Sequence, residues 1–167
     1  MQRIFFALWP DDDTRARVAA VGEQLTPWQG RRVRPENLHI TLAFLGDVEE
    51  AITTQLQSVR IPGRGFSVTL DNLGWWRGPR VIWLAPTLIP PALTSLVDTI
   101  NTHVAGLGID VDPRPYRPHL TLVRKAARRP PPVEFEPIFW QINGFCLVQS
   151  ETGQTGSNYK VLCSWPL

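Results

Sequence analysis

The chain has few of the residues that mark several common protein classes. Its 167 residues include two cysteines, Cys146 and Cys163, too few for a disulfide framework, and no Cys-x-x-Cys pair suggests a zinc site. No apolar run approaches the roughly 20 residues that a membrane-spanning helix needs. The first ten residues lack the basic and apolar regions of a signal peptide. We therefore expect a soluble, cytoplasmic protein with buried free thiols.

Lysine is also scarce, since it occurs only at Lys125 and Lys160 and every other basic residue is an arginine. The net charge of +2 is too small to indicate a nucleic-acid-binding protein by itself. The planar guanidinium of arginine suits phosphate, but a genome rich in arginine codons would give the same composition. The hydrophobic content of 43% is typical of a globular protein. The length favours one domain over residues 1–167, built from two intertwined lobes.

Hydrophobic periodicity predicts intermixed strands and helices. Helices are expected after Asp11–Asp13, from Asp47, and from Pro90 to Leu107, where the apolar stripe is clearest. Loops are expected at Pro27–Pro35 and Pro130–Pro132. Because no linker divides the chain, the pattern favours an α+β or α/β fold. The expected strands cover Arg3–Trp9, His39–Gly46, Phe66–Trp76, Arg80–Pro86, a segment from His119, Gln141–Ser150 and Tyr159–Trp165.

The chain contains an internal repeat. A strand that begins at Arg3, a helix and the motif His39-Ile-Thr-Leu42 match a strand that begins at Arg80, a helix and the motif His119-Leu-Thr-Leu122. Two such β-α-β units predict a duplicated fold with approximate twofold symmetry. Equivalent residues of the two copies could then meet across the axis.

Two of the three histidines occupy the same place in this repeated motif. Alternate residues of a strand share a face, so His39 lies beside Thr41, and His119 beside Thr121. A pKa near 6.5 lets one imidazole accept a proton while the other donates one. Each such transfer typically contributes about 10²–10⁴-fold to a rate. The threonine hydroxyls can bond the non-bridging oxygens of a phosphate. The pattern predicts metal-independent acid–base cleavage of a cyclic phosphodiester.

Other interpretations of the two motifs stay open. They could be polar strand faces covered by helices, or they could form a two-histidine metal site. No carboxylate or cysteine accompanies either motif at ligand spacing, which disfavours the metal site. A third alternative is a module that binds RNA ends without cleaving them, although binding alone needs no matched acid and base.

The segments His39-Ile-Thr-Leu-Ala-Phe-Leu-Gly46 and Pro118-His-Leu-Thr-Leu-Val-Arg124 resemble the paired signatures of the two-histidine (2H) phosphoesterases. The most similar branch is that of the RNA 2′,3′-cyclic phosphodiesterases, historically called 2′-5′ RNA ligases. The likeness extends from the opening Arg-Ile-Phe-Phe-Ala strand, through Tyr116-Arg-Pro-His119, to a closing Tyr-x-x-Leu-x-x-Trp segment.

The resemblance implies a bilobal α+β fold of the LigT-like kind, with mainly antiparallel sheets around a central cleft. It implies hydrolysis of a terminal 2′,3′-cyclic phosphate to a 2′-phosphomonoester without a cofactor, with weak reversible 2′-5′ ligation. His39 would be the proton donor and His119 the acceptor. The residues themselves leave this polarity open, because the repeats are symmetric. The expected partner is RNA with a 2′,3′-cyclic end or a small cyclic nucleotide, bound by a monomer.

Three further residues are candidates for substrate binding. Tyr116 could stack on a base, and Arg117 could hold a phosphate. Arg124 ends the second motif as in the family, but strict alternation places it on the face opposite to His119. A β-bulge or a strand end would be needed to turn Arg124 toward a phosphate.

Other polar and aromatic residues are expected to be structural. Three arginines precede the first motif and could contact an RNA backbone, although a solvated loop is the simpler expectation: Arg31, Arg32 and Arg34. His103 lies at the edge of the third helix, where a structural role is expected. The same holds for three tryptophans in strands, which are expected to pack in the core or at its rim: Trp75, Trp76 and Trp83.

Overall fold

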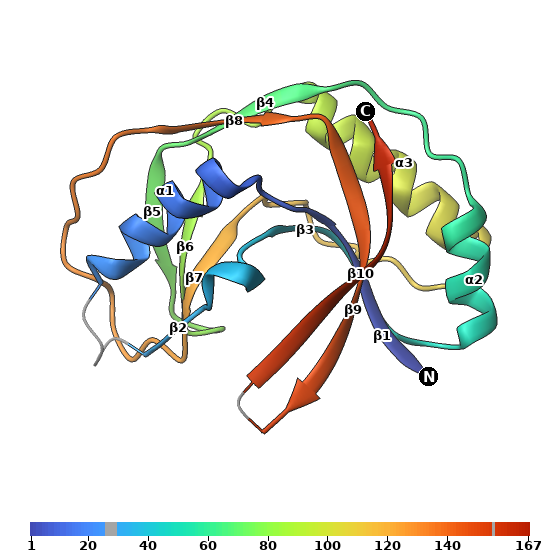
Figure 1. Ribbon diagram of the computed structural model, residues 1–167, viewed down its shortest axis with the longest axis horizontal. Coiled ribbons are helices and arrows are strands. Elements are labelled where there is room, and N and C mark those ends of the chain that lie inside the picture. The colour runs from blue at the N-terminus through green and yellow to red at the C-terminus, as the bar shows by residue number, and fades with distance from the viewer. Residues whose placement is uncertain (26–29, 155) are drawn as a thin grey trace.

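A computed structural model describes residues 1–25, 30–154 and 156–167 (Figure 1). Its helices are α1 (Asp12–Glu23), α2 (Glu50–Ser58), α3 (Pro91–Gly106) and the short 3₁₀ helix η2 (Pro35–Asn37). Its strands are β1 (Gln2–Leu8), β2 (Arg31–Arg32), β3 (Ile40–Val48), β4 (Phe66–Leu70), β5 (Asn72–Trp76), β6 (Val81–Ala85), β7 (Leu120–Arg124), β8 (Ile138–Ile142), β9 (Gly144–Gly153) and β10 (Gly156–Pro166). Within the described ranges, no helix is long and apolar enough to cross a membrane.

Two helices begin with the signals that the sequence contains. Asp11 caps α1, since its carboxylate accepts hydrogen bonds at 2.8 Å from both the backbone N–H and the hydroxyl of Thr14. Pro91 occupies the first turn of α3, where a missing N–H does not weaken the helix. The apolar stripe of α3 is buried through Leu93, Val97 and Ile100. Both predicted helices are confirmed.

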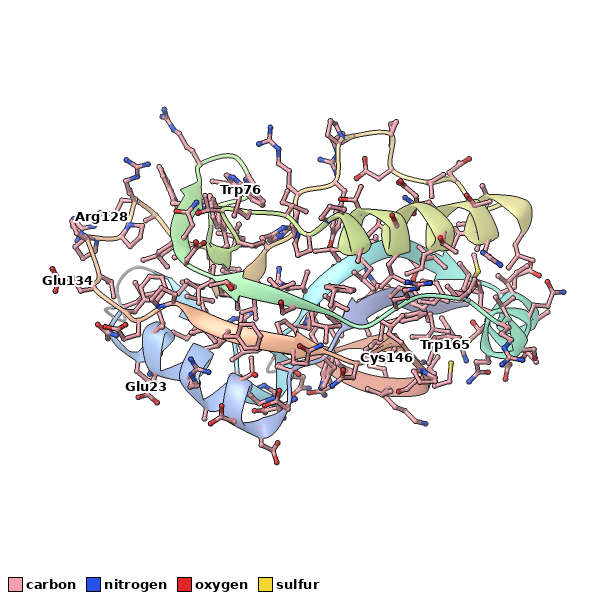
Figure 2. The ribbon with its side chains drawn as sticks, turned by 90° about the horizontal axis from the view of Figure 1, so that it is seen from above. Glu23, Trp76, Arg128, Glu134, Cys146 and Trp165 are labelled. Carbon is pink, nitrogen blue, oxygen red and sulfur yellow. The ribbon has the colours of Figure 1, made fainter. Side chains whose placement is uncertain are left out.

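One large sheet organises the molecule. It contains β10, β9, β1, β3, β7, β6 and β5 in that order, with β2 paired to β7, while β4 and β8 form a separate two-stranded sheet. Every pairing is antiparallel. In Figure 2, α1 lies below the strands and α3 lies above them. The prediction of an α+β fold with mainly antiparallel sheets is confirmed.

The two copies of the repeat form two neighbouring strand pairs, β1–β3 and β6–β7. The copies meet at the centre of the sheet, where β3 and β7 pair through Ile40 and Leu120 alone. Both side chains are fully buried. The point of closest approach therefore directly follows the two histidines in the sequence.

Several predicted boundaries are wrong. Asp47 does not start a helix but extends β3 by pairing with Arg3, and α2 begins only at Glu50. The expected strand Phe66–Trp76 breaks at Asp71, whose carboxylate accepts the Thr87 N–H, so that β4 and β5 join different sheets. The segment Gln141–Ser150 likewise divides between β8 and β9. The expected loop Pro27–Pro35 contains β2 and the start of η2, and its residues 27–29 lie outside the described ranges.

Candidate active site

The central strands bring the two repeated motifs together on one face of the sheet. Ile40 and Leu120 pair and share one face of the sheet. Because side chains alternate along a strand, the residues on either side of each of them point to the opposite face. The register thus gathers four polar side chains: His39, Thr41, His119 and Thr121.

Both imidazoles are held in the same way. Nδ1 of His39 lies 2.7 Å from the carbonyl oxygen of Asn37, and Nδ1 of His119 lies 2.8 Å from the carbonyl oxygen of Arg117. Because a carbonyl oxygen only accepts, each Nδ1 donates and carries a proton. Each Nε2 is therefore the atom that is free to take up or release a proton.

The two rings differ in their electrostatic surroundings. Burial, with smaller contributions from the positive charges of Arg124 and His119, lowers the pKa of His39 to about 4, although the bond to Asn37 opposes this shift. Burial and the charge of Arg124 also lower the pKa of His119, against the opposing bond to Arg117. The charge of Arg124 thus contributes to lowering the pKa of both rings.

A β-bulge turns Arg124 toward the histidines. On β7, Val123 pairs with Ile82 and Thr121 pairs with Trp83, so Leu122 is an extra residue in the ladder. Leu122 and Val123 are consequently both buried, and the alternation resumes with Arg124 exposed on the face of Thr121. Strict alternation would place Arg124 on the face opposite to His119, and the bulge brings it to the same face.

The first copy carries the same bulge but a different residue after it. On β3, Leu42 is the extra residue, because Ala43 pairs with Phe6 and Thr41 pairs with Ala7. Phe44 then occupies the position that corresponds to Arg124. Phe44 is 51% exposed. One half of the site therefore carries a cation where the other carries an aromatic ring.

Three aromatic rings surround His39. Trp9 stacks on its imidazole with ring centroids 5.3 Å apart and an angle of 12° between the planes. Phe5 lies 4.9 Å away, and Tyr159 from β10 meets the ring edge-on at 5.2 Å. The sequence analysis missed these three residues. The alternation of Phe5, Ala7 and Trp9 along the first strand was the available signal, but it required the β1–β3 register.

His119 lies in a more open setting. Its nearest ring is that of Trp76 at the end of β5, labelled in Figure 2, with centroids 4.6 Å apart and an angle of 69°. His119 opens onto a cleft of about 1010 Å³, whereas His39 does not line it. Other residues that line this cleft include Thr41, Phe44, Trp76, Tyr116 and Arg117.

The remaining predicted site residues lie near this cleft. The Tyr116 hydroxyl donates a 3.0 Å hydrogen bond to the carbonyl oxygen of Thr41, so it ties the second motif to the first. Burial raises the pKa of Tyr116, and the hydroxyl stays protonated. The side chain of Arg117 is exposed. Outside the cleft, His103 bonds the Thr99 carbonyl oxygen within α3 at 2.9 Å, as expected of a structural histidine.

The described residues contain no group of three or more His, Cys, Asp or Glu side chains that could hold a metal ion. The two strands carry two imidazoles and two threonine hydroxyls on one face, and of these His119 and Thr41 line the cleft. Such a set can transfer protons at Nε2 and stabilise an anion between the strands.

Comparison with known proteins places the chain in a family. Residues 10–154 match the model of the 2′-5′ RNA ligase superfamily. The chain belongs to this superfamily.

Individual relatives agree over nearly the full length. The chain is 34% identical to the RNA 2′,3′-cyclic phosphodiesterase of Escherichia coli K12, covering 99% of this chain and 97% of that protein. It is 30% identical to the enzyme of the same name from Thermus thermophilus, covering 96% and 87%. The crystal structure of E. coli LigT in apo form matches with a TM-score of 0.87 and 32% identity, over 99% of this chain and 96% of that chain. The LigT-like fold that the resemblance implied is confirmed.

Proposed function

We propose that this enzyme hydrolyses the 2′,3′-cyclic phosphate at the end of an RNA to a 2′-phosphomonoester, with His39 and His119 as a proton-transfer pair. Relatives that cover nearly the whole chain carry the name RNA 2′,3′-cyclic phosphodiesterase. The observation that carries the proposal is the matched pair of imidazoles. Each is fixed through Nδ1 and leaves Nε2 free on the same face of the sheet.

The proposed reaction needs one proton acceptor and one proton donor. Nε2 of His119, which opens onto the cleft, accepts a proton from water, and the water oxygen forms a bond to phosphorus. The bond from phosphorus to O3′ breaks, and Nε2 of protonated His39 donates its proton to O3′. The 2′-phosphate and a 3′-hydroxyl remain. Replacing the water by a 5′-hydroxyl reverses the cleavage of a 2′-5′ diester, and in water we expect this ligation to be weak.

Thr41, Thr121 and Arg124 stabilise the charge that builds on the non-bridging oxygens. Arg124 also explains how a histidine with a low pKa can become an acid. In the free enzyme its charge opposes protonation of both rings. A bound phosphate anion offsets that charge, and so binding of the substrate raises the pKa of His39. Tyr116 and Arg117 are proposed to contact the nucleotide from the wall of the cleft.

A small cyclic nucleotide is the second candidate substrate. E. coli LigT, which aligns with this chain at a TM-score of 0.86, was crystallised with 3′-AMP, a non-cyclic mononucleotide, so a single nucleotide is large enough to bind that relative. We further propose that the enzyme acts as a monomer in the cytoplasm, where free thiols stay reduced. Cys146 is buried as expected, but Cys163 is only half-buried, so the expectation of two buried thiols is wrong for Cys163.

The test is to incubate an oligonucleotide ending in a 2′,3′-cyclic phosphate with the enzyme, with and without EDTA, and to locate the phosphate of the product. The proposal expects a 2′-phosphomonoester formed at the same rate in both samples. A product with a 3′-phosphate would show that O2′, and not O3′, is the leaving oxygen, and would contradict the proposed reaction. Loss of activity in EDTA would contradict metal-independent proton transfer, and binding without turnover would favour an RNA-end-binding module.

A further inference from the structure

A group of unpaired cations lies at the end of β7, next to the histidines. In the ladder between β2 and β7, Arg31 stands directly opposite Arg124. Like charges at opposed positions destabilise a sheet. Neither arginine forms a salt bridge within the described part of the chain, where the ion pairs involve other residues. The pair therefore leaves a position for an external anion.

The backbones of β2 and β7 approach each other closely beside Arg31 and Arg124. A Cβ on Gly30, which has φ of 138°, would collide with the carbonyl oxygen of Arg124, so only glycine lets β2 reach β7 here. Arg80 and Lys125 also have left-handed φ values, 58° and 56°, which are uncommon for residues other than glycine. The N–H of Ala126 donates to the Arg80 carbonyl oxygen at 2.8 Å and closes this end of the strands.

The tip of the β9–β10 hairpin orients Arg31. A Cβ placed on Gly156 would lie 3.8 Å from Cζ and from both terminal nitrogens of Arg31, so the guanidinium plane faces the glycine. The neighbouring Arg34 is held differently, because its Nη2 donates to Ser157 and Asn158 of the same hairpin. Figure 1 shows this hairpin extending away from the remaining strands. The guanidinium of Arg31 thus lies against the hairpin at Gly156.

We propose that Arg31 forms a second phosphate subsite, which binds the internucleotide phosphate on the 5′ side of the nucleotide that carries the cyclic phosphate. This inference rests on the proposed function. Arg124 serves the reacting phosphate, and its cross-strand neighbour Arg31 serves the next phosphate of the same strand. The subsite would make the enzyme prefer RNA ends over mononucleotides, because a nucleoside 2′,3′-cyclic phosphate has no group to place there.

The test compares cytidine 2′,3′-cyclic phosphate with a cytidine dinucleotide that has the same cyclic end. The unaltered enzyme is expected to show a higher kcat/KM for the dinucleotide. Arg31→Gln should lower kcat/KM for the dinucleotide about 10-fold, mainly through KM, and leave the mononucleotide nearly unchanged. The slope of log kcat/KM against log salt for the dinucleotide should fall by about 0.7. Arg31→Lys should restore part of the preference.

Arg32→Gln is the matched control. It removes the same charge from the next residue of β2, whose side chain points to the other face of the sheet. It should keep the dinucleotide preference of the unaltered enzyme. Equal effects of Arg31→Gln and Arg32→Gln, or an unaltered enzyme with no dinucleotide preference, would overturn the subsite while leaving hydrolysis intact. If the unaltered enzyme hydrolyses neither substrate, the proposed function itself fails.

Discussion

The two halves of the site share a backbone and differ in what surrounds it. Each half has a histidine whose Nδ1 donates to the carbonyl oxygen two residues before it, and each has a bulge three residues after the histidine. Around His39 lie three aromatic rings and the charge of Arg124, whereas His119 meets Trp76 and the open cleft. The duplication accounts for the pair of proton carriers. The differing neighbours give the two rings unequal electrostatic surroundings.

Removing either imidazole gives the largest expected effect. His39→Ala and His119→Ala should each lower turnover of a 2′,3′-cyclic oligonucleotide by about 10²–10⁴-fold. His103→Ala is the control, because its imidazole bonds within α3. Near wild-type turnover in either active-site variant would show that the two halves do not cooperate in catalysis.

Neutralising Arg124 should remove the cation that distinguishes the halves. We expect Arg124→Gln to lower kcat/KM about 10²-fold, because charge on the phosphate loses its stabilisation. Lys160→Gln removes one exposed charge from β10 and should have little effect.

Arg124→Gln should also change how kcat/KM depends on pH. The proposed mechanism requires His39 protonated and His119 neutral, and the surroundings lower both pKa values below 6.5 in the free enzyme. The bell-shaped profile of kcat/KM should therefore have its optimum below pH 6.5. Without the charge of Arg124 both pKa values rise, and the optimum should move to higher pH. A profile that stays in place would mean that Arg124 does not act on the rings.

Changing one aromatic neighbour at a time should separate the two rings. Trp9→Leu admits water to His39 and should raise its pKa toward the ordinary value, and Trp76→Leu should do the same for His119. Each change also loosens the orientation of the ring and should lower kcat about 10-fold. NMR titration of the two imidazoles measures this directly. If both pKa values shifted in both variants, the surroundings would not be independent.

Tyr116→Phe is expected to have the smallest effect. It keeps the ring at the cleft and removes the hydrogen bond to Thr41, so unfolding should become easier by about 1 kcal/mol with little change in KM. Tyr116→Ala also removes the ring and should raise KM if the ring contacts the base. Equal KM values in the two variants would leave Tyr116 with a structural role only.

The sequence predicted that the two motifs place their histidines and threonines on one face, because both motifs keep the same spacing and alternation decides which side chains share a face. It could not predict the position of Arg124, since nothing in the pair Leu122-Val123 marks an extra residue. Trp9 was also missed. It reaches His39 through the register of β1 and β3, and that register depends on packing between segments far apart in the chain. The break at Asp71 has the same cause. Whether β4 and β5 join one sheet or two depends on packing with distant segments of the chain.

The single residue pair that joins β3 to β7 has a mechanical consequence. Among the described residues, β3 and β7 are joined by fewer residue pairs than any other neighbouring strands of the large sheet. If one half of the molecule rocks against the other, this pair acts as the pivot. Groups beside a pivot move least, so the spacing between the two imidazoles would stay nearly constant while the outer walls of the cleft open and close around RNA ends of different size.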